Sequence, residues 1–248
     1  MLGDLPGIRR LGPDDADAHV LADIALRDPL MCLRVLLNAS RRFGHPLVAP
    51  SQTVTAALVL TGVDPFFRDC VELPVLEERL AGQPLALAGA LAAIDRAHAA
   101  ARLAAAIAIH RQDEQVERLH QAALLSDFPR LLLWCEAPEL VLEMQKRQRH
   151  DPALRSADVQ REVLGVELDA LAAALVDRWQ LPDSLRELTE SRHADRPGPW
   201  TMRLAVRIAR HLQSGWHDPA LPDDFVALAA LLNVKLTVAA SLVRRTSG

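Results

Sequence analysis

The stretch LADIALRDPLMCLRVLLNAS, residues 21–40, decides the fold. Apolar residues recur at helical spacing over 21–25 and stop at Asp28 and Pro29, where an aspartate can cap a helix and a proline suits a first helical turn. The same spacing resumes over 30–37. The stretch therefore predicts two consecutive amphipathic helices.

Helical periodicity recurs along the rest of the chain, and no segment shows the strict alternation of a half-buried strand. Leu and Ala dominate the apolar residues and Tyr is absent, a composition that favours helix over sheet. The clearest pattern is 167–179, whose apolar face carries Leu168, Leu171, Ala172, Leu175 and Trp179. Further helices are expected near 86–110, 113–126, 138–149, 158–164, 183–193, 200–214, 223–232 and 235–245. We predict an all-α, multi-helical bundle.

Turn and cap signals divide this helical chain. Ser51 is expected to cap a helix that closes at Gly62. The glycine and proline of 82–84 mark the best internal boundary, because a long Ala-rich helical pattern follows them. We therefore expect an N-terminal helical subdomain over 1–82 and a second subdomain over 83–248.

Composition excludes several classes of protein. The 248 residues are 50% hydrophobic and 24% charged, as in a globular chain, and the formal charge of -4 argues against a protein that coats nucleic acid. No apolar run is long enough for a membrane span and no secretory signal is recognised, so a cytoplasmic location is expected. Three scattered cysteines suit neither a disulfide framework nor a zinc-ligand spacing.

Two groups of short motifs resemble one known family. The run 21–40 with Ser51 and the stretch ALVLTGV, residues 57–63, is similar to the N-terminal part of the HDOD family, which comprises bacterial regulatory domains on a degenerate HD-phosphohydrolase scaffold. Downstream, VLGV (163–166), WQLP (179–182) and the pair Arg192-His193 resemble the family's order of a Leu-Gly turn, a helix ending in Trp-x-Leu-Pro and a later histidine. The resemblance covers roughly residues 20–235 and implies an HD-like bundle with an N-terminal helical subdomain.

The resemblance also implies where an HD hydrolase would hold its divalent metal. His98 stands at the first histidine of the family, and Ser126 and Asp127 stand at the His-Asp pair. Leu168 replaces the next histidine, and the helix that should carry the final aspartate, 200–215, contains no acidic residue. One imidazole and one carboxylate are too few for a metal that would activate water. We expect a vestigial site at His98, Ser126, Asp127 and Leu168, with no catalytic residue, metal or cofactor.

Each remaining polar residue of this region has an alternative role. His120 precedes Asp127 by seven residues, about 10.5 Å along a helix, too far for both to ligate one ion. Asp127 is suited to a cap or a hydrogen-bond acceptor near Pro129, where a helix must end, and His98 to a partly buried histidine. No nucleophile elbow, phosphate loop or dinucleotide fingerprint is present.

A basic stripe is the other candidate site. Arg203, Arg207 and Arg210 lie on one helical face. With the upstream residues Arg192, His193 and Arg196, they could form a basic concavity for an anionic ligand such as a nucleotide second messenger, or for an acidic segment of a partner. The alternative is a solvated arginine face paired with Glu187, Glu190 or Asp195.

These observations lead to one expected function and two alternatives. The resemblance implies a non-enzymatic bacterial signal-transduction module that acts through contacts with a signalling protein. One alternative is a divergent metal-dependent phosphohydrolase that uses His98 and Asp127 with water completing the coordination. The other is a receptor for a ligand of the cyclic-nucleotide type.

Overall fold

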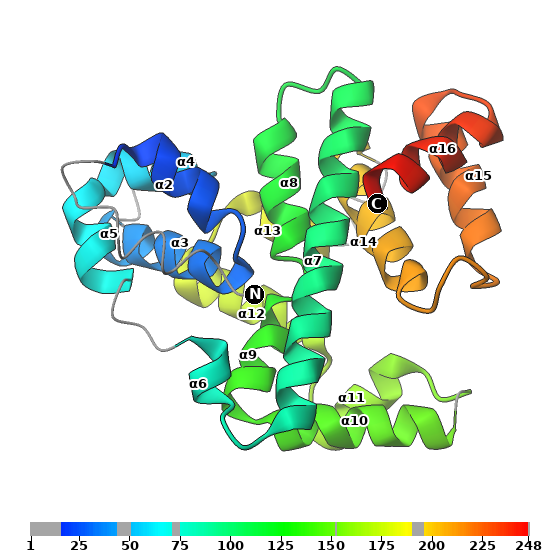
Figure 1. Cartoon of the computed structure of the whole chain (residues 1–248), viewed down its shortest axis with the longest axis horizontal. Helices are drawn as coiled ribbons and strands as arrows, with labels where there is room; N and C mark the ends of the chain where they lie inside the picture. Colours follow the sequence, from blue (N-terminus) through cyan, green and yellow to red (C-terminus); the bar gives the residue numbers. More distant parts are fainter. Residues whose placement is uncertain (1–15, 44–50, 71–74, 152, 190–195, 248) are drawn as a thin grey trace. The chain divides into compact units, whose positions relative to one another are not determined.

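The computed structural model describes residues 16–43, 51–70, 75–151, 153–189 and 196–247, and these residues form helices joined by turns, with no strand among them (Figure 1). The all-α prediction is confirmed. The helices are α2 Ala18–Ala25, α3 Pro29–Phe43, α4 Val54–Thr61, α5 Val63–Cys70, α6 Leu76–Arg79, α7 Pro84–His110, α8 Val116–Leu124, α9 Phe128–Glu136, α10 Pro138–His150, α11 Ser156–Leu164, α12 Leu168–Trp179, α13 Asp183–Thr189, α14 Pro197–Leu212, α15 Leu221–Leu232 and α16 Leu236–Ser247.

The junction of α2 and α3 follows the local chemistry of its sequence. The carboxylate of Asp28 is 7% exposed, and its Oδ1 accepts hydrogen bonds from the backbone N–H groups of Leu30 at 2.8 Å and Met31 at 3.2 Å. These bonds satisfy donors that the first turn of a helix leaves without partners. The predicted cap at Asp28, followed by Pro29 as the first residue of α3, is confirmed.

One local prediction was wrong, and the start of one helix was missed. The cap of α4 is Thr53 rather than Ser51, because the helix begins at Val54 and the Thr53 hydroxyl accepts the N–H of Ala56 at 3.1 Å. A helix was expected to end before Pro129, and α8 does end at Leu124, but the sequence did not predict that α9 begins at Phe128. Pro129 lies in the first turn of α9, where its missing N–H breaks no helical hydrogen bond.

The described chain divides into two compact units. The first comprises the described residues of Met1–Ile94 and Asp127–Leu181. In it, α2 and α3 pack against α4, and α10 packs against α9 and α11 (Figure 1). One core cluster of this unit is formed by Leu76, Leu80, Ala86, Ala90, Ala93, Ile94, Leu131, Trp134, Val141, Met144 and Val159.

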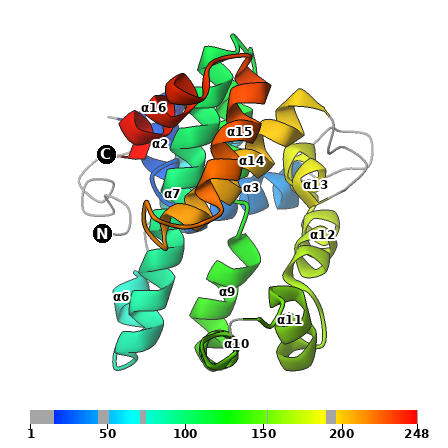
Figure 2. The ribbon, with the colours of Figure 1, turned by 90° about the vertical axis from the view of Figure 1, so that its right-hand side faces the viewer.

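The second unit comprises the described residues of Asp95–Ser126 and Pro182–Gly248. Here α14 packs against α8. It also packs against α15, and α15 packs against α16 (Figure 2). The apolar face of α14 enters a core formed by Ala100, Leu103, Ala104, Ile107, Ala123, Leu204, Ala205, Ile208, Ala209, Leu221, Leu228, Leu232, Ala239 and Val243. This packing fixes the orientation of the polar face of α14.

The long helix α7 contributes to both units, since its residues up to Ile94 belong to the first and the rest to the second. The sequence predicted subdomains over 1–82 and 83–248, whose boundary differs from those of the two compact units. That division stays a prediction. Among the described residues, no single helix has the length and apolar composition to cross a membrane. The helices α15 and α16 meet the two criteria only when they are taken together, and the pair is bent by 105°.

Candidate functional site

The polar face of α14 carries the arginines that the sequence singled out. Arg203 and Arg207 are half-buried and Arg210 is exposed, whereas Leu204 and Ile208 on the opposite face are fully buried. The helix is amphipathic because its charged and apolar residues alternate at the helical period. The arginine stripe is therefore held at the surface of the second unit by the packing of α14.

A buried carboxylate lies against this stripe. Asp224, in the first turn of α15, is 2% exposed, and its Oδ1 accepts a hydrogen bond from Nε of Arg207 at 2.6 Å. Its Oδ2 lies 2.6 Å from Nδ1 of His211. The Arg207 guanidinium also lies over the Trp200 ring, 5.7 Å from its centroid, a cation–π arrangement. Both oxygens of Asp224 are thus engaged, as a buried carboxylate requires.

The structure gives Arg207 a partner, Asp224, that the sequence did not suggest. Of the three acids expected to pair with the stripe, Glu187 instead contacts NH2 of Arg118 at 3.3 Å. The other two, Glu190 and Asp195, lie outside the described residues, as do Arg192 and His193 of the predicted concavity. Asp224 was missed. The sequence signal for it is only an acidic residue at the start of an expected helix, 17 residues after Arg207.

The family's metal positions are divided between the two units. His98, half-buried on α7, and Ser126, after α8, belong to the second unit, whereas Asp127 and Leu168 belong to the first. Leu168 begins α12 and is buried at 5% exposure, which suits a core residue. Among the described residues, no three His, Cys, Asp or Glu side chains gather where they could hold a metal ion.

Asp127 acts as an acceptor for an arginine. It occupies the N-cap position of α9 without a side-chain cap bond. Nε of Arg130, one turn further on, donates to its Oδ2 at 3.1 Å and its Oδ1 at 3.3 Å. Both oxygens of the carboxylate therefore face a guanidinium, which neutralises its charge locally.

His98 lies within electrostatic reach of a second histidine in its own unit. Burial lowers the pKa of His120, the positive charge of protonated His98 lowers it further, and Glu117 opposes both effects. The imidazole of His120 is thus favoured in its neutral form. The sequence did not predict this electrostatic effect of His98, on α7, on His120, on α8.

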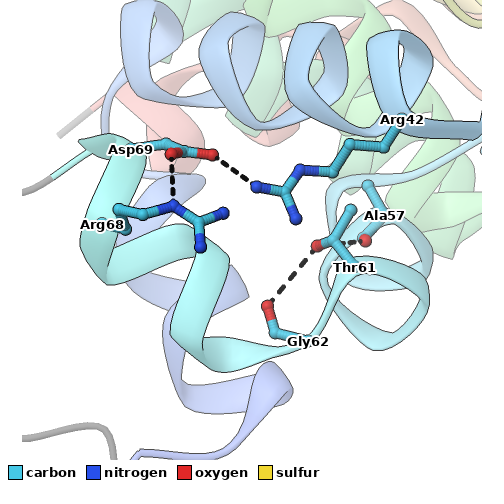
Figure 3. A network of polar contacts seen from close by, with 6 residues as sticks. All are labelled: Arg42, Ala57, Thr61, Gly62, Arg68 and Asp69. Carbon is cyan, nitrogen blue, oxygen red and sulfur yellow. Dashed lines mark hydrogen bonds and ion pairs between the residues drawn. The ribbon is translucent and has the colours of Figure 1, made fainter.

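A separate arginine cluster, also not predicted, lies in the first unit (Figure 3). Asp69 on α5 accepts from NH2 of Arg42 at 3.0 Å and from Nε of Arg68 at 3.2 Å. Burial raises the pKa of Asp69, but the hydrogen bonds and charges of Arg68 and Arg42 outweigh it and hold the pKa below its ordinary value. The nearby Thr61 hydroxyl donates to the carbonyl of Ala57 at 2.9 Å. The cluster joins α3 to α5.

An all-α chain with these features resembles proteins of known structure. The HDOD domain model matches residues 8–195, so the chain belongs to the HDOD family. The chain is similar to the MmoQ response regulator from Methylococcus capsulatus str. Bath, with 22% identity and a TM-score of 0.72 over 96% of this chain and 94% of that one.

A virulence factor, cj0248, from Campylobacter jejuni subsp. jejuni shares 19% identity with a TM-score of 0.67, over 98% of this chain and 90% of that one. At sequence identities of 22% and 19%, the two comparisons show similarity of fold alone. No curated protein matches the chain significantly.

Proposed function

We propose that this chain is a non-enzymatic regulatory module that acts in the bacterial cytoplasm through contacts with a signalling protein. Family membership suggests a module of the regulatory or signalling type, and one similar structure is described as a response regulator. Within that class, the residues at the family's metal positions favour a binding role over catalysis.

One observation carries the non-enzymatic part of this proposal. Asp127 is the sole carboxylate at those positions, and Nε of Arg130 faces both of its oxygens at 3.1 and 3.3 Å. A divalent cation would have to displace a guanidinium that already neutralises this charge. At the two family positions expected to carry imidazoles, this chain has the hydroxyl of Ser126 and the alkyl chain of Leu168, and neither side chain is a good ligand for a catalytic metal.

A metal-binding experiment tests this part. Purified protein is loaded with Mn²⁺, dialysed against buffer without chelator, and analysed for retained metal beside an Asp127→Ala variant and an Arg130→Gln variant. We expect far less than one equivalent of metal in the wild type and no difference for Asp127→Ala. One tightly held equivalent that Asp127→Ala removes would overturn the proposal in favour of a divergent phosphohydrolase.

The partner-binding part is tested separately. The tagged chain, expressed at its native level, is isolated with its bound proteins, and each candidate partner is then purified and titrated against the chain. We expect direct, saturable binding of a receiver-containing or second-messenger protein. If every partner so isolated fails to bind when both proteins are pure, the protein-contact mode is wrong.

A further inference from the structure

A pocket with a volume of about 290 Å³ lies within the second unit, where the first turn of α8, the start of α13 and the first turn of α14 meet. Its lining includes Arg118 and Leu119 of α8, Ser184 of α13, and Arg196 just before α14. This volume lies at the lower end of the range of about 300–1,000 Å³ that small-molecule sites occupy. The size suits a ligand smaller than a cyclic dinucleotide.

A buried hydroxyl in this lining lacks a partner. Ser184 is fully buried, and its Oγ forms no hydrogen bond with any residue that the structure describes. Buried polar groups are almost always hydrogen-bonded, and an orphaned one in a native structure points to a bound molecule or water. Ser184 therefore marks the inner wall of the pocket as a place for a polar group of a ligand.

Two arginines line the same pocket. Arg118 is held in place by Oε1 of Gln115 at 3.2 Å and Oε2 of Glu187 at 3.3 Å. Arg196 is exposed and, in the part of the chain that the structure describes, forms no ion pair. The planar guanidinium group matches a carboxylate or phosphate through paired N–H donors. The start of the 16-residue α14, directly after Arg196, adds the positive end of a helix dipole.

The two acids of the pocket are already engaged. Oδ1 of Asp113 accepts the backbone N–H of Gln115 at 2.9 Å, before the first turn of α8. Glu187 is paired with Arg118 across a distance of 3.3 Å, longer than an optimal charge-assisted hydrogen bond. A stronger acceptor that entered the pocket would compete with Glu187 for this guanidinium. The pocket thus contains three groups that could bind an anionic ligand. The guanidinium of Arg196 has no ion pair among the described residues, that of Arg118 could exchange Glu187 for the ligand, and the Ser184 hydroxyl could form a hydrogen bond.

We propose that this pocket binds a small molecule through a carboxylate or phosphate group, with Arg196 and Arg118 contacting the anion and the Ser184 hydroxyl bonding to a neighbouring polar atom. This site is separate from the family's metal positions and from the arginine stripe of α14, and it goes beyond the proposed protein-contact function. Binding of an anion here would join α8, α13 and α14 through a common ligand.

Titration calorimetry of the full chain with inorganic phosphate, guanosine monophosphate and citrate at low ionic strength tests the proposal. We expect saturable one-site binding of at least one probe, and the preference between the phosphate and carboxylate probes identifies the group. Arg196→Gln should weaken binding by about tenfold, since it removes a charge-assisted contact. Arg210→Gln is the matched control, because it removes an exposed arginine from α14 outside the pocket, and it should leave binding unchanged within about twofold.

Two further variants separate a ligand role from a structural one. Ser184→Ala should weaken binding by a few-fold while leaving the melting temperature of the free protein unchanged or higher, because the hydroxyl has no hydrogen-bond partner among the described residues to lose. Glu187→Gln should strengthen binding, because it removes the competitor for Arg118 and a negative charge. Absence of binding for all three probes at millimolar concentration, or equal losses in Arg196→Gln and Arg210→Gln, would overturn the proposal.

Discussion

Asp224 is the shared acceptor for two side chains on the polar face of α14, Arg207 and His211. Asp224→Ala leaves Arg207 and His211 without their shared acceptor. Removing one member of a buried pair costs about 3–5 kcal/mol, and the value here should be lower, about 2–3 kcal/mol, because the Arg207 side chain is 35% exposed and can turn to water. Urea unfolding at pH 7 measures this loss of unfolding free energy.

The neighbouring acid provides a control for that measurement. Asp223 is exposed in the same first turn of α15, so it shares the helix-dipole interaction but not the buried pair. Asp223→Ala should change the unfolding free energy by no more than about 0.5 kcal/mol. Equal losses in the two variants would mean that the dipole, rather than the pair with Arg207 and His211, stabilises this turn.

His120 makes stability depend on pH. Its pKa is lowered in the folded protein, first by burial and then by His98, so the unfolded chain binds the proton more readily. The contribution to stability is therefore complete above the ordinary histidine pKa of about 6.5 and is lost as the pH falls toward the folded value. Proton NMR titration of His98→Gln should show the pKa of His120 raised but still below that ordinary value, because burial remains. An unchanged His120 pKa in that variant would rule out the coupling of the two imidazoles.

At the scale of single helices, the sequence predicted those in which an apolar stripe coincides with end signals. The predicted 167–179 and 138–149 correspond to α12 and α10 with ends shifted by one residue at most. The helix α9 was missed, because Pro129 was interpreted only as a stop signal although it also suits a first helical turn. Its short apolar run, with Trp134 buried, has no periodicity long enough to distinguish it from a loop.

The packing of α7 against α9 depends on one glycine. A Cβ added at Gly89 would lie 2.3 Å from Cζ2 of Trp134, whose ring is 1% exposed and cannot move into solvent. Gly89→Ala should therefore lower the unfolding free energy by about 2 kcal/mol or more, despite the better helix propensity of alanine. In Gly198→Ala, the new Cβ meets only Cδ2 of Leu119, at an ordinary 3.6 Å, and stability should be unchanged or slightly higher. Chemical denaturation of the two variants distinguishes close packing from propensity, and a Gly89→Ala protein as stable as Gly198→Ala would refute the close contact.

At the scale of the molecule, the sequence predicted local features of the candidate sites and not their partners. The arginine stripe of α14 follows from spacing within one helix. The partner of Arg207 depends on how α15 packs against α14, and the pocket brings Arg118, Ser184 and Arg196 together from three separate elements. Contacts between residues of separate helices depend on how the helices pack, and the hydrophobic periodicity of one segment does not specify that packing.

The order of segments in the two units leads to a prediction about the whole chain. A break between Ser126 and Asp127 gives two fragments, and each unit contains segments of both. Fragment 127–248 would expose Leu204 and Ile208 without the core partners that α7 supplies, and fragment 1–126 would lack Trp134. Neither fragment alone should show cooperative thermal unfolding by circular dichroism, whereas co-expressed fragments should copurify as a folded complex, because each core is then complete. Cooperative unfolding of fragment 127–248 by itself would mean that its helices form a core without α7, contrary to the division described.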